Sequence, residues 1–214
     1  MRPMGPGKSR GRSASTRRST VPTSTRRILP GPQGDLSNYR NLLAEPGDHG
    51  VGRSRGGLST KIHHLVDGRG LPLVILVGPG QSGDAPMFPA LMGHLRVARP
   101  GRGRPRTRPD RVRGDKAYSS RAIRTHLRSR GITAVIPEPS DQIGHRKRRG
   151  AKGGRPPGFD RDDYRGRNVV ERSFNQAKQW RGLATRYDKL AVVYRGAAVL
   201  HAITLWLKRL GDTR

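Results

Sequence analysis

Two apolar runs in the middle of the chain limit its fold more narrowly than any other feature. The runs "STKIHHLVD" and "LPLVILVGPG" are rich in Leu, Ile and Val, and the residues from Asp67 to Gly70 join them. Apolar, β-branched runs bounded by Asp and Gly are typical of strands, and a short connection of this kind joins antiparallel neighbours. We therefore predict a β-hairpin as the centre of the fold.

Helical and strand patterns alternate after the hairpin. Behind Asp84, a residue suited to cap a helix N-terminus, Met87, Leu91 and Leu95 recur at helical spacing. This alternation predicts a mixed α/β sheet with helices packed on it. The later elements are expected to be a strand in "RVRGDKAY", a helix in "SSRAIRTHLRSRG", a strand in "ITAVIPEP", a basic loop in "RKRRGAKGGRPPGF", a helix containing "YRGRNVVERSFNQAK" and a helix in "AVVYRGAAVLHAITLWLKRL".

The N-terminal segment has a different composition. Residues 1–51 are rich in Arg, Ser, Pro and Gly and show no apolar period. Such a segment buries too little surface to offset the entropy lost on ordering. We expect a disordered or irregular basic segment over 1–51 and a folded domain over 52–214.

The charge of the chain indicates a polyanionic partner. It has 44 Lys and Arg residues against 15 Asp and Glu residues, a formal net charge of +29. Basic groups that neutralise phosphates release condensed counterions, so this excess favours nucleic-acid binding. Cys is absent, which excludes disulfides and thiolate metal sites. With no secretory signal and no apolar run long enough for a bilayer, we expect a cytoplasmic, nucleoid-associated protein without a membrane partner.

The stretch "YRGRNVVERSFNQAK" places four polar side chains on one side of its predicted helix. At 100° per residue, Tyr164, Arg167, Glu171 and Lys178 fall within about a 60° sector, at the edge of the apolar stripe. Glu171 would then project into a cleft while the helix stays anchored. A solvated face with an Arg167–Glu171 ion pair at i,i+4 explains the same spacing.

A second acidic residue stands at a strand end. Asp115 follows the predicted strand "RVRG", and in open α/β sheets ligands and catalytic groups gather at that end. Alternatively, Asp115 is a turn or cap residue ahead of the helix that follows it. His63 and His64 point to opposite faces of a strand, so we interpret them as structural residues rather than ligands of one metal.

These residues carry a family resemblance. "VGRSRGGLSTKIHHLVDGRGLPL", "PGQSGDAPMF", "GDKAYSSRAIR" and "YRGRNVVERSFNQAKQWRGLATRYDK" resemble DDE transposases of bacterial insertion sequences, of the insertion sequence five family, from about Gly52 to Leu210. The resemblance implies an RNase H-like fold. It also implies DNA cleavage and strand transfer at terminal inverted repeats, with Mg²⁺, or Mn²⁺ as its substitute, and a homodimer across paired ends.

The resemblance assigns roles to matching positions. Asp115 and Glu171 would be the catalytic, metal-binding carboxylates, because two hard cations held by oxygen ligands suit phosphoryl transfer. Other basic and aromatic residues would contact DNA or order the site. These are Tyr164, Arg167 and Lys178 in the motif, Arg181 and Arg186 after it, and Lys147, Arg148 and Arg149 in the basic loop.

The chain departs from the family at its start. The family's first catalytic Asp lies on its first strand, in an Asp-Ser-Thr stretch, and no such stretch precedes "GRSRGG". We expect the first strand to be missing or degenerate. "PTSTRRI" stands near the expected position. If residues 23–27 were encoded by ACG-TCG-ACT-CGA-CGC, the same bases read two positions later would encode Val-Asp-Ser-Thr. We therefore hypothesise an N-terminus truncated or frameshifted relative to the family.

Three functions fit this reading. The first is a transposase whose activity is impaired because the first Asp is absent. The second is a non-catalytic, DNA-binding transposase remnant. The third is a basic RNA-binding protein, which explains the charge equally well but not the ordered acidic motifs.

Overall fold

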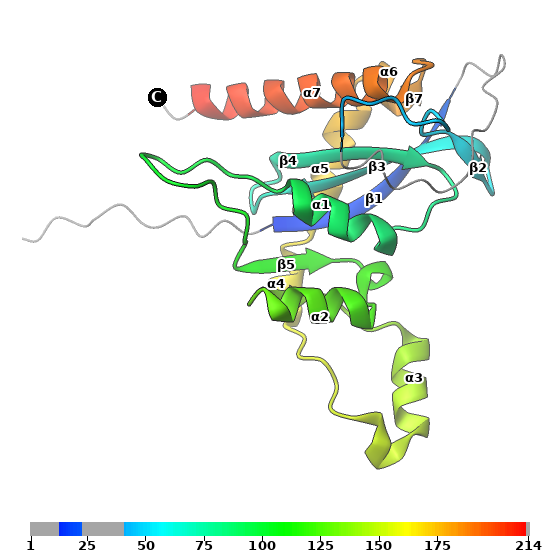
Figure 1. Ribbon diagram of the computed structural model, residues 1–214, viewed down its shortest axis with the longest axis vertical. Helices are drawn as coiled ribbons and strands as arrows, with labels where there is room; N and C mark the ends of the chain where they lie inside the picture. Colours follow the sequence, from blue (N-terminus) through cyan, green and yellow to red (C-terminus); the bar gives the residue numbers. More distant parts are fainter. Residues whose placement is uncertain (1–12, 23–40, 213–214) are drawn as a thin grey trace, which may run out of the picture.

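The computed structural model describes residues 13–22 and 41–212 and has a mixed sheet at its centre (Figure 1). The strand order is β2-β3-β1-β5-β6, with β4 also pairing with β3 and β7 with β1. β1 is antiparallel to β3 and parallel to β5, and β5 is parallel to β6. The strands are β1 (Ser13–Pro22), β2 (Gly52–Ser54), β3 (Gly57–Val66), β4 (Pro72–Pro79), β5 (Arg111–Gly114), β6 (Thr133–Val135) and β7 (Thr185–Arg186).

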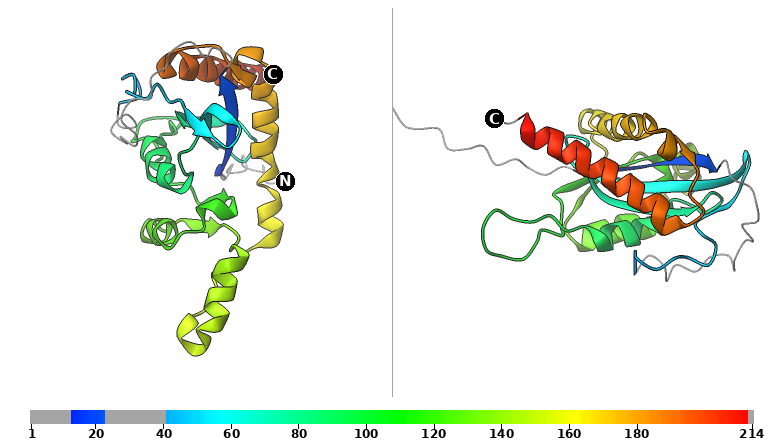
Figure 2. Two further views of the ribbon diagram at one scale, coloured as in Figure 1. Left: turned by 90° about the vertical axis from the view of Figure 1, so that its right-hand side faces the viewer. Right: turned by 90° about the horizontal axis from the view of Figure 1, so that it is seen from above.

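Helices cover both faces of the sheet (Figure 2). On one face α1 and α2 pack on Leu65, Leu76 and Val112, and on the other α5, α6 and α7 pack on Ile62 and Val77. This layering is the expected α/β architecture and agrees with an RNase H-like fold. The α-helices are α1 (Phe88–His94), α2 (Arg121–Ser129), α3 (Ser140–Arg148), α4 (Arg161–Arg165), α5 (Asn168–Lys178), α6 (Arg181–Ala184) and α7 (Ala191–Gly211), and the 3-10 helices are η2 (Ala85–Met87), η3 (Lys116–Tyr118) and η4 (Gly150–Gly153).

The predicted hairpin is confirmed. β3 and β4 pair antiparallel, and Oδ1 of Asp67 accepts hydrogen bonds from the backbone N–H groups of Arg69 and Leu71, each 2.9 Å long. His63 and His64 lie in β3 and point to opposite faces, as predicted. The ring of His64 stacks on Phe174 with centroids 4.0 Å apart, whereas Nδ1 of His63 lies 3.9 Å from Asp84. Each histidine is therefore part of a different packed layer.

The N-terminal segment corrects part of the sequence prediction. Residues 13–22 form β1, in the centre of the sheet between β3 and β5, so the first strand is present and these ten residues are not irregular. The stretch "SASTRRSTVP" has no apolar alternation to indicate a strand. β1 nevertheless pairs with β3 over residues 14–20, with β5 over 13–15 and with β7 over 21–22. Such pairing depends on distant parts of the chain, so the local sequence pattern does not indicate it. The strand is degenerate in one respect: it contains no acidic residue, and the first acid of the chain is Asp35, which lies outside the described residues.

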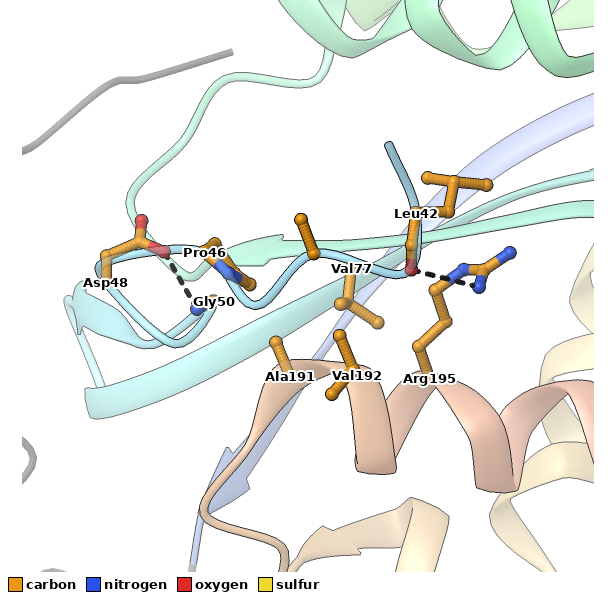
Figure 3. A pocket seen from close by; sticks show the side chains of 9 residues that line it. Leu42, Pro46, Asp48, Gly50, Val77, Ala191, Val192 and Arg195 are labelled. Atoms are coloured by element: carbon orange, nitrogen blue, oxygen red, sulfur yellow. Dashed lines mark hydrogen bonds between the residues drawn. The ribbon is translucent and has the colours of Figure 1, made fainter. Parts of the chain in front are cut away.

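Residues 41–51 form turns that dock on α7. The carboxylate of Glu45 accepts hydrogen bonds from the N–H groups of Ala191 (2.8 Å) and Val192 (3.0 Å), and it thereby caps the helix. A pocket of about 30 Å³ remains between this segment and α7 (Figure 3). That volume holds about one or two water molecules, so the pocket is too small for a substrate.

Two other predicted boundaries are wrong. Lys147 and Arg148 lie in α3, not in a loop, because the stretch before Gly150 contains no proline to stop the helix. The helix predicted around "YRGRNVVERSFNQAK" is two helices, α4 and α5, which separate at Gly166. The side chain of Asp160 accepts a hydrogen bond from the N–H of Asp163 and caps α4.

Candidate active site

The two predicted catalytic carboxylates face the same guanidinium group. Asp115 directly follows β5, and Glu171 lies in the first turn of α5. Nη2 of Arg167 lies 2.9 Å from Oε1 of Glu171 and 3.7 Å from Oδ2 of Asp115. The side chains of Asp115 and Glu171 keep 40% and 31% of their surface exposed, so both carboxylates remain accessible to a substrate.

The structure bears on two alternatives that the sequence left open, a solvated helix face for the motif residues and a capping role for Asp115. The Arg167–Glu171 ion pair exists, but Asp115 joins it from a strand 52 residues earlier in the chain, so the arrangement is more than a solvated helix face. Asp115 precedes η3 without forming a side-chain cap hydrogen bond, and Ser120 caps α2 instead. The capping explanation of Asp115 is therefore wrong.

Tyr164 belongs to the same cluster. Burial raises the pKa of its phenol, the carboxylates of Asp115 and Glu171 raise it further, and the charge of Arg167 opposes them. The hydroxyl stays protonated at neutral pH and is able to donate a hydrogen bond. Three of the four motif residues thus lie together with Asp115, although α4 and α5 are separate helices.

A buried ion pair sets the position of Asp115 relative to α4. Nε of Arg113 in β5 donates to the backbone oxygen of Asp163 at 2.7 Å, and its Nη2 contacts the Asp163 carboxylate. Nη1 of Arg111 lies 3.1 Å from the same carboxylate oxygen. Burial alone would raise the pKa of Asp163, but the hydrogen bonds from Arg113 and Arg111 hold that pKa below its ordinary value. These contacts join the end of β5 to the helix that carries Tyr164.

Gly166 leaves room for this ion pair. A Cβ atom at position 166 would lie 2.9 Å from Cζ of Arg113, whose side chain is only 2% exposed. The backbone of Gly166 has φ −61° and ψ −11°, which any residue adopts, so space rather than conformation requires glycine here. The break between α4 and α5 therefore lies where the Arg113 guanidinium passes the chain.

Sequence reasoning missed this ion pair, although two signals were available. Arg111 and Arg113 alternate with the buried Val112, so both arginines leave the core face of β5. The stretch "DRDD" places three acids at the start of α4. The opposite charges of β5 and α4 are consistent with a contact between them. The sequence alone does not show that these two elements are neighbours, so it does not predict the ion pair.

The basic residues predicted to contact DNA fall into two groups. Lys147, Arg148 and Arg149 are exposed on α3 and at its end. α3 follows β6, and β6 is parallel to β5, so this arm arises from the same edge of the sheet as Asp115 (Figure 1). The hydroxyl of Ser119 donates to Oε1 of Gln142 at 3.1 Å and ties the arm to the segment after Asp115.

Beyond the carboxylates, Lys178 and Arg181 are exposed and Arg186 is not. Lys178 lies seven residues after Glu171, roughly 10 Å further along α5 on the same side. Arg181 donates from Nε to the hydroxyl of Tyr187 at 3.0 Å. Arg186 has 0% exposure, and its Nη1 donates to the hydroxyl of Thr60 at 2.5 Å. The prediction that Arg186 contacts DNA is wrong, because its guanidinium is enclosed and bonded to backbone oxygens of residues 50, 188 and 189.

The donors at the site suit one hard cation better than two. Among residues 13–22 and 41–212, no group of three or more His, Asp or Glu residues could hold a metal ion. Mg²⁺ is commonly held by one or two carboxylates, with water and substrate phosphate as the remaining ligands. The oxygens of Asp115 and Glu171 fit that role if Arg167, now between them, turns toward another anion. A bridge between two ions would require a further carboxylate.

Comparisons with known proteins agree on one family. A family model described as a transposase DDE domain matches residues 30–207. A Brucella ovis protein described as a transposase for insertion sequence element IS6501 is 29% identical over 155 residues, which is 71% of this chain and the whole of that protein. No solved structure matches the chain. None of the helices described is long and apolar enough to cross a membrane.

Proposed function

We propose, on the premise that the chain belongs to the transposase DDE domain family, that it is an insertion sequence transposase domain that cleaves and joins DNA by phosphoryl transfer. The observation that carries the proposal is the convergence of Asp115 and Glu171 on one atom, Nη2 of Arg167. The similarity to the Brucella ovis protein supports the link to an insertion sequence. Membership of the narrower insertion sequence five family stays a prediction.

In this function Asp115 and Glu171 would hold a divalent ion, Mg²⁺ or its substitute Mn²⁺, which would supply electrostatic stabilisation of the negative charge that develops during phosphoryl transfer. Arg167 balances the charge of the two carboxylates in the free protein and pairs with a DNA phosphate once DNA binds. Tyr164, protonated because its pKa is raised, donates a hydrogen bond to the same backbone. The Arg113–Asp163 ion pair keeps these groups in place.

DNA is the partner that the family implies, and the described surface supports backbone contacts. Lys147, Arg148 and Arg149 would hold a duplex at the edge of the sheet where Asp115 lies, while Lys178 and Arg181 follow it along α5 and α6. We propose the terminal inverted repeats of the element as the sequence bound. Replacing one of these basic residues should lower the salt slope of DNA binding by about one without changing sequence preference.

We also propose a homodimer, supported by an apolar stripe on α7. Val193, Leu200, Ile203, Leu207 and Leu210 are 46–63% exposed, and their spacing of seven, three, four and three residues is that of a helix–helix seam. A second copy of α7 would bury these side chains. The chain should sediment as a dimer, and Leu200→Lys with Leu207→Lys should yield monomers. A wild-type chain that is monomeric at all concentrations would exclude this dimer.

We expect the activity to be impaired. β1 occupies the position of the family's first strand without an acidic residue, so the site lacks the carboxylate that would bridge two ions. The family match begins at residue 30, which leads us to place the hypothesised frame junction before it. The nucleotide sequence that encodes residues 1–51 tests this: if no shifted frame encodes an Asp-Ser-Thr stretch there, the hypothesis fails.

Nicking of supercoiled plasmid in Mg²⁺ or Mn²⁺ tests the proposed chemistry. We expect slow nicking that Asp115→Asn and Glu171→Gln each abolish, while Asp212→Asn, a carboxylate at the distant end of α7, leaves it unchanged. Nicking that persists in both site variants would overturn the proposal.

The second candidate function is a non-catalytic DNA-binding remnant, and the absent acid in β1 favours it. It predicts tight DNA binding with no metal-dependent nicking. The family match argues against a basic RNA-binding protein, the third alternative from the sequence.

A further inference from the structure

A narrow arginine-rich finger projects from the domain between α1 and β5 (Figures 1 and 2). We define the finger as residues 97–106. Its base is an isolated antiparallel bridge in which the N–H of Val97 donates to the oxygen of Arg106 at 2.9 Å, and the N–H of Arg106 donates back at 2.7 Å. Arg106 also reaches Asp110 at 2.5 Å, so the base of the finger is fixed to the start of β5.

The tip of the finger, Gly101-Arg102-Gly103-Arg104-Pro105, is built for close approach to a ligand. Gly101 and Gly103 have φ values of +90° and +144°, and a Cβ atom at either position would meet nothing within 4 Å. No contact within the protein therefore requires glycine at these positions, and the two glycines leave a thin backbone on both sides of Arg102. Arg104 precedes a proline, which restricts it to extended conformations. Residues 98–105 are all exposed.

The charge of the finger selects an anionic partner. No acidic residue occurs between Asp84 and Asp110, and within the described part of the chain Arg102 and Arg104 reach no carboxylate. Only Gly103 separates the two arginines, so their Cα atoms lie at most roughly 7 Å apart, about two base-pair steps of duplex DNA.

The minor groove of A·T-rich DNA is the surface that fits this shape. It is about 6 Å wide in ordinary B-DNA, too narrow for a helix but open to an extended chain with small residues. Its potential is most negative where A·T tracts narrow it, and arginine side chains insert there. We propose that the finger places Arg102 and Arg104 in the minor groove of A·T-rich duplex DNA and gives the protein a preference for such sequences.

The position of the finger separates this contact from the chemistry. Residues 107–110 connect the finger to the start of β5, and Asp115 follows the end of β5, so the two sites lie at opposite ends of the strand. The finger would contact duplex at least roughly 13 Å, about four base pairs, from the scissile phosphate. The inference goes beyond the proposed phosphoryl transfer and needs only that the partner is DNA. Its failure would leave the nicking results untouched.

Three duplexes that differ only in their central six base pairs test the proposal with the full chain. The centres are A·T, G·C and I·C pairs, because inosine lacks the 2-amino group that marks guanine in the minor groove but keeps the major-groove pattern of guanine. Fluorescence anisotropy should show the A·T and I·C duplexes bound about tenfold more tightly than the G·C duplex. Equal affinities, or I·C binding like G·C, would overturn the proposal.

A matched pair of variants assigns the preference to the finger. Arg102→Ala with Arg104→Ala should bring the three affinities together. Arg128→Ala with Arg155→Ala removes the same charge from a groove beside β6 and should weaken all three equally, leaving the tenfold ratio. If the first variant keeps the ratio, the finger does not read the groove. Both finger arginines are exposed, so an unchanged far-ultraviolet circular dichroism spectrum should confirm folding, and plasmid nicking should persist.

Discussion

Replacing Gly166 with Ala should destabilise the protein even though the backbone there is helical. In an unobstructed helix Ala is more favourable than Gly by about 1 kcal/mol. Here the new methyl would lie 2.9 Å from Cζ of Arg113, against an ordinary contact of about 3.5–4.0 Å. Arg113 cannot move aside without disturbing its buried bond to Asp163, and breaking such a pair costs about 3–5 kcal/mol. With partial relaxation, we expect a net loss of about 2 kcal/mol in the free energy of unfolding.

Urea denaturation of the full chain measures this loss. With a slope of about 2 kcal/mol/M, the midpoint of Gly166→Ala should fall by about 1 M without a change in slope. The matched control is Gly196→Ala inside α7, where an added Cβ meets nothing within 4 Å and stability should rise by up to about 1 kcal/mol. If Gly166→Ala stabilises the protein as Gly196→Ala does, the contact between position 166 and Arg113 is not what we describe.

Three further predictions concern other described contacts. Because the pKa of Asp163 is lowered in the folded protein, its ionised carboxylate adds to the free energy of unfolding above the ordinary pKa of 3.8. This stabilisation is lost as the pH falls through the lower pKa of the folded state, and melting curves from pH 7 to pH 3 should show the loss. Asp163→Asn should lower the melting temperature at pH 7 and make it depend less on pH. Glu45→Ala removes the cap of α7 and should cost about 1 kcal/mol in urea, whereas an unchanged midpoint would show that the cap is dispensable. In the register that pairs Ser15 of β1 with Gly114 of β5, position 16 is the next one along and lies beside Asp115. Thr16→Asp should therefore increase metal-dependent nicking, whereas Arg17→Asp, on the opposite face of the strand, should not. Equal effects of the two variants would refute this register.

The parts of the fold that the sequence predicted correctly are those determined by short, continuous stretches of residues. The β3–β4 hairpin follows from two apolar runs and a turn, and α7 follows from a long apolar period. Asp115 and Glu171 were predicted as catalytic residues from the family resemblance, one at a predicted strand end and the other in the spaced motif that carries the resemblance. The structure adds that Arg167 lies between them.

The remaining features depend on contacts between distant parts of the chain. The polar composition of β1 does not indicate a strand. The segment forms one because it pairs with β3 and β5. Arg186 was predicted to contact DNA from the family resemblance, yet its guanidinium is buried and bonded to Thr60 and to three backbone oxygens. The need for glycine at position 166 could not be predicted, because the side chain that requires it, Arg113, is 53 residues earlier in the sequence.

Titration of the full chain with Mn²⁺, followed by electron paramagnetic resonance, tests the central claim most directly. If Asp115 and Glu171 share a cation site, Asp115→Asn and Glu171→Gln should each weaken Mn²⁺ binding by on the order of tenfold or more, and Asp212→Asn should not. Arg167→Ala should strengthen binding, because it removes a positive charge 2.9 Å from Glu171 and 3.7 Å from Asp115. Mn²⁺ affinities that are the same in the wild-type chain and in the Asp115, Glu171 and Arg167 variants would contradict the account.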